Sequence, residues 1–259
     1  MPKIGFLQSD YDGIPDLDRQ KFQLAHNNAE LEIVMANSVE ELPKKSDFYF
    51  EIQGAAWVLS CSSQDWAPLK IDFDSRRARQ RFEDPLRWRD PLAKACALTP
   101  KNAGSKILDL TAGLGGDSAA MAYLGAQVIA VERSIVLYFL LKDGLGRSES
   151  LSKNFILEWV TAEAKLNSLS LSGEKFDVIY LDPMFSTEKK KALPPREMQY
   201  LRKLLGEEPA GVTHDLLERA LKTSVKRVVM KNSLKAEVHP KRNFVVEGKS
   251  HRFDVFLKT

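Results

Sequence analysis

The chain has 259 residues, of which 44% are hydrophobic and 28% are charged, a balance typical of one large globular domain or two unequal ones. No apolar run approaches the roughly 18 residues of a membrane span, and the amino-terminal residues lack a signal-peptide core, so no membrane partner is expected. The two cysteines, Cys61 and Cys96, lie far apart, and the four histidines show no metal-ligand spacing. These counts exclude a disulfide framework, predict no metal site and favour a reducing, cytoplasmic setting.

The formal net charge of +3 is unevenly distributed. Residues 1–75 contain 6 basic and 13 acidic residues, whereas residues 76–259 contain 32 basic and 22 acidic residues. A basic carboxyl-terminal part suits a polyanion such as nucleic acid. A lysine-rich solvated surface is the simpler explanation of the charge taken alone.

Residues 1–75 are expected to form a small α+β domain without a catalytic constellation. Short apolar runs between polar turns predict strands at Ile4–Leu7, Leu31–Met35, Phe48–Ile52 and Ala56–Ser60, with Trp66–Phe73 as a further candidate. Short helices are expected at Phe22–His26 and Val39–Leu42. The aromatic side chains of this part are interpreted as core, because acidic surroundings disfavour RNA stacking.

Residues 76–90 are expected to be a basic linker. Phe82 and Trp88 alternate with six arginines, which are Arg76, Arg77, Arg79, Arg81, Arg87 and Arg89. The arginines could follow a phosphate backbone, or they could be the solvated face of a helix. The sequence favours neither interpretation.

Residues 91–259 alternate between strand and helix patterns, which predicts a mostly parallel sheet in an α/β domain. The expected strands are Lys106–Leu110, Gln127–Val131, Phe155–Val160, Phe176–Leu181, Arg227–Lys231, Phe244–Glu247 and Phe253–Lys258, the last two forming an antiparallel pair. The expected helices are Pro91–Leu98, Asp117–Leu124, Ser134–Leu145, Glu197–Leu205 and Val212–Thr223, the last capped by Thr213.

A glycine-rich turn follows the first strand of this sheet. Residues 107–118 read ILDLTAGLGGDS. The strand is therefore followed by a turn that contains Gly113, Gly115 and Gly116, and then by a helix of small residues. Glycine is needed where backbone adopts a positive φ or approaches a ligand closely, and strand, turn and helix together open a nucleotide-binding unit. Ser118 replaces the last glycine of the full fingerprint, so a purely structural turn is equally compatible with the motif alone.

Acidic residues follow three of the predicted strands. Glu132 can accept hydrogen bonds from the two hydroxyls of a ribose, and Glu163 could meet an adenine amino group or remain a solvated glutamate. Asp182 opens the segment Asp182-Pro183-Met184-Phe185. Because the carboxyl ends of parallel strands share one edge, a single crevice is expected to gather these acids with Gly113.

These motifs resemble the bacterial 16S ribosomal RNA guanine-N2 methyltransferases, which depend on S-adenosylmethionine. The resemblance extends from about Arg89 to the carboxyl terminus. The matching segments are residues 89–93, 109–117, 132–133, 182–185 and 251–254. The resemblance implies a Rossmann-like seven-stranded methyltransferase sheet beside the smaller α+β domain, S-adenosylmethionine as cofactor, and 16S RNA or the small ribosomal subunit as partner.

The resemblance also implies roles for individual residues. The cofactor-binding positions would be Asp109, Gly113, Gly116, Asp117, Glu132, Arg133, Glu163, Ala164 and Asp182. The catalytic positions would be Asp182 and the Pro183 carbonyl, which would accept the two N–H groups of the target amine, and Phe185, which would stack on the base. The sequence departs from the usual family pattern at Gly116, where arginine is common, and at Ser186, where proline is usual.

Three other functions stay open at this point. An adenine-N6 methyltransferase of DNA or RNA would use nearly the same chemistry at Asp182. A non-catalytic RNA-binding protein could retain the fold, and an NAD-dependent oxidoreductase could share the glycine turn. Candidate phosphate contacts are Lys189, Lys190, Lys191, Lys231, Lys241, Arg242, Lys249 and Arg252, although each of them could be an ordinary surface residue. No motif specifies the target guanosine or an oligomeric state.

Overall fold

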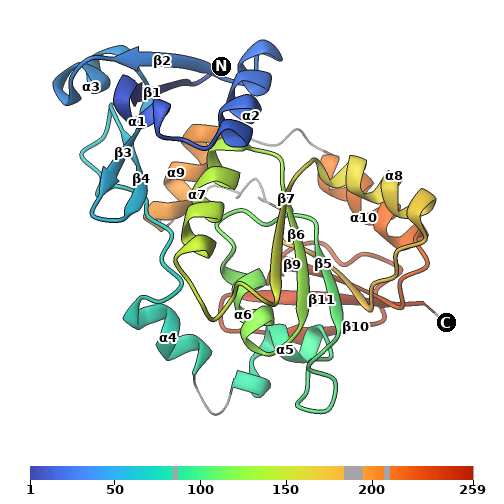
Figure 1. Ribbon diagram of the computed structural model, residues 1–259. Coiled ribbons are helices and arrows are strands. Elements are labelled where there is room, and N and C mark those ends of the chain that lie inside the picture. Colours follow the sequence, from blue (N-terminus) through green and yellow to red (C-terminus); the bar gives the residue numbers. More distant parts are fainter. Residues whose placement is uncertain (84–86, 184–194, 207–210, 259) are drawn as a thin grey trace. The chain divides into compact units, whose positions relative to one another are not determined.

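The computed structural model describes residues 1–83, 87–183, 195–206 and 211–258 (Figure 1). The catalytic candidate Phe185 and the lysines at 189–191 lie outside the described residues, as do the side chains of Arg77, Arg81 and Phe82. The chain forms two compact units. The first comprises Met1–Ile71, Ser134–Gly144 and the described part of Thr187–Glu207, and the second comprises the remaining described residues.

The first unit contains a four-stranded sheet in the order β2-β1-β3-β4. The strands are β1 (Lys3–Leu7), β2 (Glu32–Ala36), β3 (Phe48–Gln53) and β4 (Ala56–Cys61), and β1 is parallel to β2 and β3 while β4 is antiparallel to β3. All four predicted strands are therefore confirmed. The fifth candidate, Trp66–Phe73, is wrong, because only Leu69 pairs, with Leu59. Its alternation reflects the burial of Leu69, Ile71 and Phe73 in an extended segment.

The helices of the first unit are longer than predicted. The short helix expected at Phe22–His26 is the central part of α2 (Asp16–Asn27), and Val39–Leu42 spans η1 (Val39–Glu41) and the start of α3 (Leu42–Lys45). A helix that the sequence did not predict, α1, covers Gln8–Asp12. The remaining helices are α7 (Ile135–Gly146), whose residues to Gly144 belong to this unit, and α9 (Arg196–Leu205).

An aromatic cluster fills the core of the first unit. Phe139 of α7 lies edge-on to Phe22, Phe50 and Trp57, with ring centroids 5.3–5.4 Å apart, and Phe6 stacks on Phe50 at 5.1 Å. These geometries are the favourable ones for aromatic pairs. The prediction that the aromatic residues of this part form core is confirmed for Phe50, which is fully buried.

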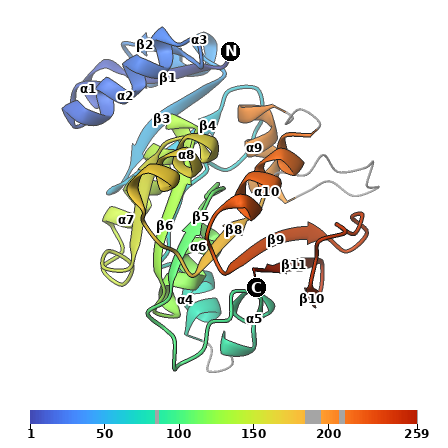
Figure 2. The same cartoon turned by 90° about the vertical axis from the view of Figure 1, so that its right-hand side faces the viewer.

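The second unit contains a seven-stranded sheet in the order β10-β11-β9-β8-β5-β6-β7. Its strands other than β7 are labelled in Figure 2, and β7 is labelled in Figure 1. The strands are β5 (Lys106–Asp109), β6 (Gln127–Glu132), β7 (Phe155–Trp159), β8 (Val178–Leu181), β9 (Arg227–Ser233), β10 (Phe244–Glu247) and β11 (His251–Leu257). Neighbours from β7 to β9 are parallel, and β11 is antiparallel to both β9 and β10. The predicted α/β fold with a closing antiparallel pair is confirmed. The strand order reverses at β5, and ligands of open α/β sheets bind beyond such a switch point.

Helices α8 (Ala162–Ser172) and α10 (Val212–Lys222) contact each other and contribute to one apolar core with the sheet. Leu166 of α8 and Leu217 of α10 belong to this core together with Ile179 of β8. The predicted cap at Thr213 is wrong. Helix α10 starts after Gly211, which has a φ of 93° and supplies no capping side chain.

The expected basic linker contains α4 (Arg76–Phe82) and η2 (Arg87–Arg89), and α5 (Pro91–Ala95) follows it. These elements lie in the second unit, which begins at Asp72. The next helix, α6 (Gly116–Tyr123), follows the glycine turn as predicted. Among the described residues, no helix has the length and apolarity needed to cross a lipid bilayer.

Candidate active site

The glycine turn after β5 adopts the conformation for which glycine was expected. Gly113 and Gly115 have φ values of 54° and 72°, which L side chains rarely adopt. Gly115 precedes α6 and provides no capping side chain, so the first turn of this helix lacks a side-chain cap. A Cβ added at Gly113 would meet only the Thr111 carbonyl, at 3.9 Å. The turn therefore presents open space and polar backbone at the switch point of the sheet.

Asp109 at the end of β5 holds this turn in place. Its carboxylate accepts hydrogen bonds from the Thr111 backbone N–H at 2.9 Å and from the Ser118 hydroxyl at 2.5 Å, and only 2% of the residue is exposed. Burial raises the pKa of Asp109 to about 7, although both hydrogen bonds oppose the shift. Through these contacts Asp109 orients the loop.

Glu132 and Asp182 both contact the turn. The Gly113 backbone N–H donates to Glu132 Oε2 at 2.9 Å, and the Asp182 backbone N–H donates to Thr111 Oγ1 at 2.6 Å. Thr111 and Gly113 are two residues apart, so the ends of β6 and β8 meet around one short segment. The two acids that the sequence assigns to one crevice therefore both contact the same short segment.

A lysine joins Asp182 to the start of α6. Lys231 Nζ lies 2.7 Å from Asp182 Oδ2 and 2.8 Å from Asp117 Oδ2, and the Tyr180 hydroxyl donates to the same Asp117 oxygen at 2.7 Å. Burial raises the pKa of Asp182 to about 6; the Lys231 ammonium opposes this shift and the Asp117 carboxylate adds to it. Burial also raises the pKa of Tyr180 well above its ordinary value, with Asp117 and Asp182 adding to the effect. The Tyr180 hydroxyl therefore stays protonated at neutral pH and donates a hydrogen bond to Asp117.

The other predicted site residues lie at the same edge but outside this cluster. Arg133 is exposed, and its carbonyl accepts a hydrogen bond from Trp159 Nε1 at 2.9 Å. Glu163 and Ala164 lie in the first turn of α8, where the Ala164 N–H donates to the Thr161 hydroxyl at 3.2 Å. Pro183 is buried next to Asp182.

Sequence reasoning missed the side chains that position the acids, namely Thr111, Ser118 and Tyr180, and it assigned Lys231 differently. Thr111 and Ser118 belong to the glycine motif, but hydroxyl residues are common in turns and gave no distinct signal. Tyr180 lies in an apolar strand, where a tyrosine reads as core. Lys231 was considered as a phosphate contact, and its two carboxylate partners contradict that interpretation.

Two other phosphate candidates have structural partners. Arg252 is only 6% exposed and contacts the Asp254 carboxylate and the carbonyls of Leu234 and Glu237. Arg242 also pairs with Asp254, which is fully buried. A buried carboxylate needs such partners, so these arginines support the fold.

Three residues with metal-ligating groups converge elsewhere in the second unit. The ligand atoms of His214, Glu218 and His239 all lie within 4.8 Å of one another, although their spacing in the sequence did not suggest this. Lys241 Nζ, however, lies 2.7 and 3.0 Å from the two Glu218 oxygens, and the Lys241 backbone N–H donates to His239 Nδ1 at 3.2 Å. The geometry is that of an ion-pair cluster in which Lys241 already neutralises the Glu218 carboxylate.

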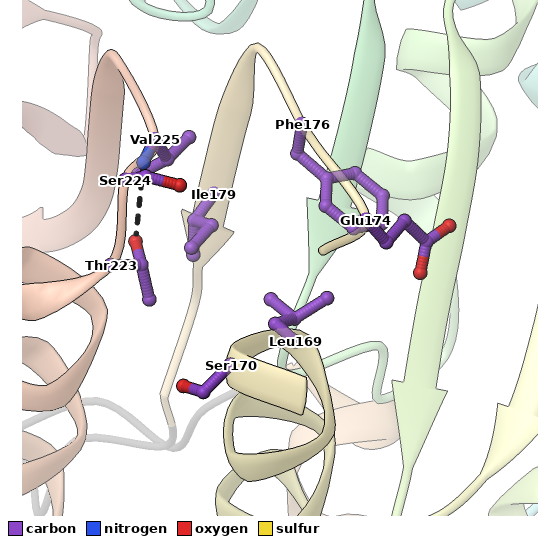
Figure 3. A pocket seen from close by; sticks show the side chains of 8 residues that line it. All are labelled: Leu169, Ser170, Glu174, Phe176, Ile179, Thr223, Ser224 and Val225. Carbon is purple, nitrogen blue, oxygen red and sulfur yellow. Dashed lines mark hydrogen bonds between the residues drawn. The ribbon is translucent and has the colours of Figure 1, made fainter. Parts of the chain in front are cut away.

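A small cavity lies at the opposite edge of the sheet (Figure 3). Phe176 and Val225 precede the amino ends of β8 and β9, and Leu169 comes from the end of α8. The cavity volume is about 60 Å³. Its lining residues lie near the amino ends of β8 and β9, whereas Asp182 and Lys231 lie at or beyond the carboxyl ends of these strands, so the cavity is separate from the carboxylate cluster.

The chemistry of the cluster suits S-adenosylmethionine. Four acidic side chains, Asp109, Asp117, Glu132 and Asp182, surround the turn, and Lys231 is the cation paired with two of them. Such an excess of carboxylates favours a ligand that carries a positive charge. The uncapped start of α6 offers backbone N–H groups for the carboxylate of an amino-acid moiety. The residues present therefore fit a cofactor with a sulfonium, a ribose and an amino-acid end.

Comparison with known proteins agrees with this geometry. Residues 18–258 match the sequence model of the family described as "Putative SAM-dependent methyltransferase". A curated relative from Alteromonas mediterranea, ribosomal RNA small subunit methyltransferase J, is 35% identical over 218 residues, which are 81% of this chain and 82% of the relative. The protein of the same name from Coxiella burnetii is 44% identical over 155 residues, covering 58% of this chain and 60% of the relative.

A solved structure supports the same assignment. The crystal structure of a SAM-dependent methyltransferase from Neisseria gonorrhoeae superimposes with a TM-score of 0.67 and 26% sequence identity, over 98% of this chain and 95% of that one. The match spans both compact units, since it leaves almost none of the chain uncovered. The chain belongs to the S-adenosylmethionine-dependent methyltransferase family that includes ribosomal RNA small subunit methyltransferase J.

Proposed function

We propose that this protein transfers a methyl group from S-adenosylmethionine to the exocyclic N2 of a guanosine in small-subunit 16S ribosomal RNA. The observation that carries the proposal is the shared contact of Glu132 and Asp182 with the turn at Thr111–Gly113. Glu132 would then bind the ribose, and Asp182 would bind the amine next to it. The names of the relatives point to ribosomal RNA of the small subunit as the substrate.

The cofactor would be held by the turn and by the ends of β6 and β7. Glu132 would accept hydrogen bonds from the ribose hydroxyls while keeping its contact with the Gly113 N–H. Backbone at Gly113, Gly116 and Asp117 would lie along the amino-acid end and the ribose. Arg133 and the pair Glu163–Ala164 would border the adenine.

When bound, S-adenosylmethionine supplies an electrophilic methyl group on a positively charged sulfur, which leaves as a neutral thioether. The protein must position the acceptor, because the lone pair of the guanine amine is delocalised into the ring. The Asp182 carboxylate and the Pro183 carbonyl would each accept one N–H of this amine, which aligns its nitrogen with the methyl carbon. The proton that the nitrogen loses would leave along the hydrogen bond to Asp182, whose charge also stabilises the developing cation.

The target base must reach this crevice with its amino group uncovered. A paired guanosine would have to be extruded from its helix, and Phe185 would stack on it, a contact worth about 1–3 kcal/mol per base. Basic residues beyond residue 75 other than Lys231, Arg242 and Arg252 would contact the RNA backbone. We place the reaction in the cytoplasm, where ribosomal RNA is found; the free, buried Cys61 and Cys96 suit a reducing compartment.

Product analysis tests the proposal. Purified protein is incubated with methyl-labelled S-adenosylmethionine and with either 16S RNA or assembled small subunits lacking the modification, and the RNA is digested to nucleosides. We expect labelled N2-methylguanosine, and no label with the Asp182→Ala variant. Labelled N6-methyladenosine would favour the adenine methyltransferase instead. Cofactor binding without transfer to either RNA substrate would favour a non-catalytic RNA-binding protein.

A further inference from the structure

Lys231 lies beside Asp182 because of the register of the sheet. Strands β8 and β9 are parallel, with Leu181 paired to Met230, so the next residues along them are Asp182 and Lys231. The lysine side chain is 22% exposed and the Asp182 side chain 34% exposed. The contact between them is thus built into neighbouring strands rather than formed by two mobile surface chains.

The ammonium group of Lys231 forms ion pairs with two carboxylates. Nζ of Lys231 is 2.7 Å from Asp182 and 2.8 Å from Asp117, whose side chain is only 14% exposed. Two carboxylates this close and partly desolvated repel each other unless one is protonated or a cation separates them. Asp182 is also within the electrostatic reach of Asp109 and Tyr180. Lys231 is a positive charge in direct contact with two of these groups.

The energetic balance at Asp182 depends on this charge. Burial and Asp117 both raise the pKa of Asp182, and Lys231 is the group that opposes them. Burial alone would lower the pKa of Lys231, but the two carboxylates outweigh it and leave that pKa above its ordinary value. The lysine is therefore charged throughout the physiological pH range. Neutralised by two acids, it is poorly suited to bind a phosphate.

We propose that Lys231 is a positioning residue, which keeps the Asp182 carboxylate charged and oriented toward the target amine and couples it to Asp117 at the cofactor side. The catalytic part of this inference rests on the proposed function. The effect of Lys231 on the ionisation of Asp182 can be measured without any turnover. Because a salt bridge of this kind fixes both partners, Lys231 would also limit the rotation of the Asp182 side chain.

Carboxylate titration tests the inference directly. Protein labelled with ¹³C at aspartate carboxyls is titrated by NMR, and the Asp182 signal is assigned by its absence in Asp182→Asn. We expect Lys231→Met to raise the midpoint of Asp182 by about one pH unit or more, because an opposite charge within about 4–6 Å lowers a carboxyl pKa by about 1–3 units. Lys231→Arg should keep the midpoint near that of the wild type. Lys175→Met, which removes an exposed lysine before the amino end of β8, is the matched control and should leave it unchanged.

A second variant gives the opposite sign and covers the case in which Lys231→Met does not fold. Asp117→Asn removes the like charge, so the midpoint of Asp182 should fall below that of the wild type. An unchanged midpoint in both Lys231→Met and Asp117→Asn, or in Asp117→Asn alone when the former is unfolded, would overturn the inference.

The pH profile of methyl transfer provides the catalytic readout. In Lys231→Met, kcat at pH 7 should fall about twofold if the pKa of Asp182 rises by one unit from about 6, and about tenfold if it rises by two units. It should recover toward the wild-type value at pH 9, because a carboxyl with a raised pKa ionises at higher pH. An equal loss at every pH would indicate a merely structural role and would overturn the inference. If wild-type protein transfers no methyl group to small-subunit RNA, the proposed function fails, whereas the NMR midpoints still decide the role of Lys231.

Discussion

The two compact units differ in what fills their centres. In the first unit, aromatic rings from α2, β1, β3, β4 and α7 pack against one another, and Phe139 of α7 lies edge-on to Phe22, Phe50 and Trp57. The second unit has an apolar core packed against its sheet, and four carboxylates and one lysine lie around the carboxyl ends of its strands. Burial of apolar surface stabilises the first arrangement, whereas desolvation of charged groups destabilises the second. Substitutions in the first unit should therefore act on folding, and those in the second on binding and catalysis.

The largest effect is expected from the aromatic core. Phe139→Ala should lower the free energy of unfolding by about 3–5 kcal/mol, because it leaves a cavity between Phe22, Phe50 and Trp57. Denaturant titration measures the change. Leu171→Ala is the control, since Leu171 is 90% exposed and should change stability by less than about 0.5 kcal/mol. Loss of cofactor binding without a loss of stability would contradict the contrast between the units.

Asp182→Ala should have the largest catalytic effect. Removing an acceptor that stabilises the transition state should lower kcat by about 10²–10³-fold, equivalent to about 3–4 kcal/mol, while cofactor binding becomes weaker but stays measurable by calorimetry. Asp177→Ala is a matched control before the other end of β8, where the carboxylate only accepts the Lys106 backbone N–H at 2.9 Å. Comparable turnover by the two variants would contradict the catalytic role of Asp182.

Glu132→Ala should act on the cofactor rather than on the chemical step. Loss of the ribose acceptor and of the Gly113 contact should weaken S-adenosylmethionine binding about 10–100-fold, or about 1.4–2.7 kcal/mol, with kcat largely restored at saturating cofactor. Glu132→Gln keeps one acceptor oxygen and should fall between the variant and the wild type. A lower kcat at saturation with an unchanged dissociation constant would reverse the roles assigned to Glu132 and Asp182.

The smallest effect is expected from Asp109, as a change in the free energy of unfolding for each pH unit. Its folded-state pKa of about 7 exceeds the ordinary carboxyl value of 3.8, so the folded protein binds this proton more tightly than the unfolded chain. The contribution of Asp109 to stability is therefore greatest below pH 4 and is lost as the pH rises toward 7. Asp109→Asn should remove this dependence.

Chemical unfolding at several pH values measures it as a difference between Asp109→Asn and wild type. The difference should change by about 1 kcal/mol per pH unit between pH 4 and 7. Asp182 also titrates in this range, but it is present in both proteins and its effect cancels to first order. A difference that stays constant with pH would show that Asp109 is ionised in the folded protein throughout.

The sequence determined the elements and the acids at their ends. Apolar runs with clear boundaries gave the seven strands of the second unit, because a buried strand is specified by its own hydrophobic residues. Local chemistry also placed Gly113 and Gly115 at positive φ and set Glu132 and Asp182 at strand ends. A resemblance in short motifs was enough to identify the family, which the comparisons confirm.

Only the tertiary structure decided how these side chains are paired. Lys231 and Asp117 are 114 residues apart, and Tyr180 and Asp117 are 63 apart, so no periodicity could join them. The extended segment at 66–73 was read as a strand because alternating burial does not reveal whether a backbone finds a partner. Local pattern fixes which face of an element is buried, whereas the partners of a polar group depend on strand order and register, which arise when the whole sheet assembles.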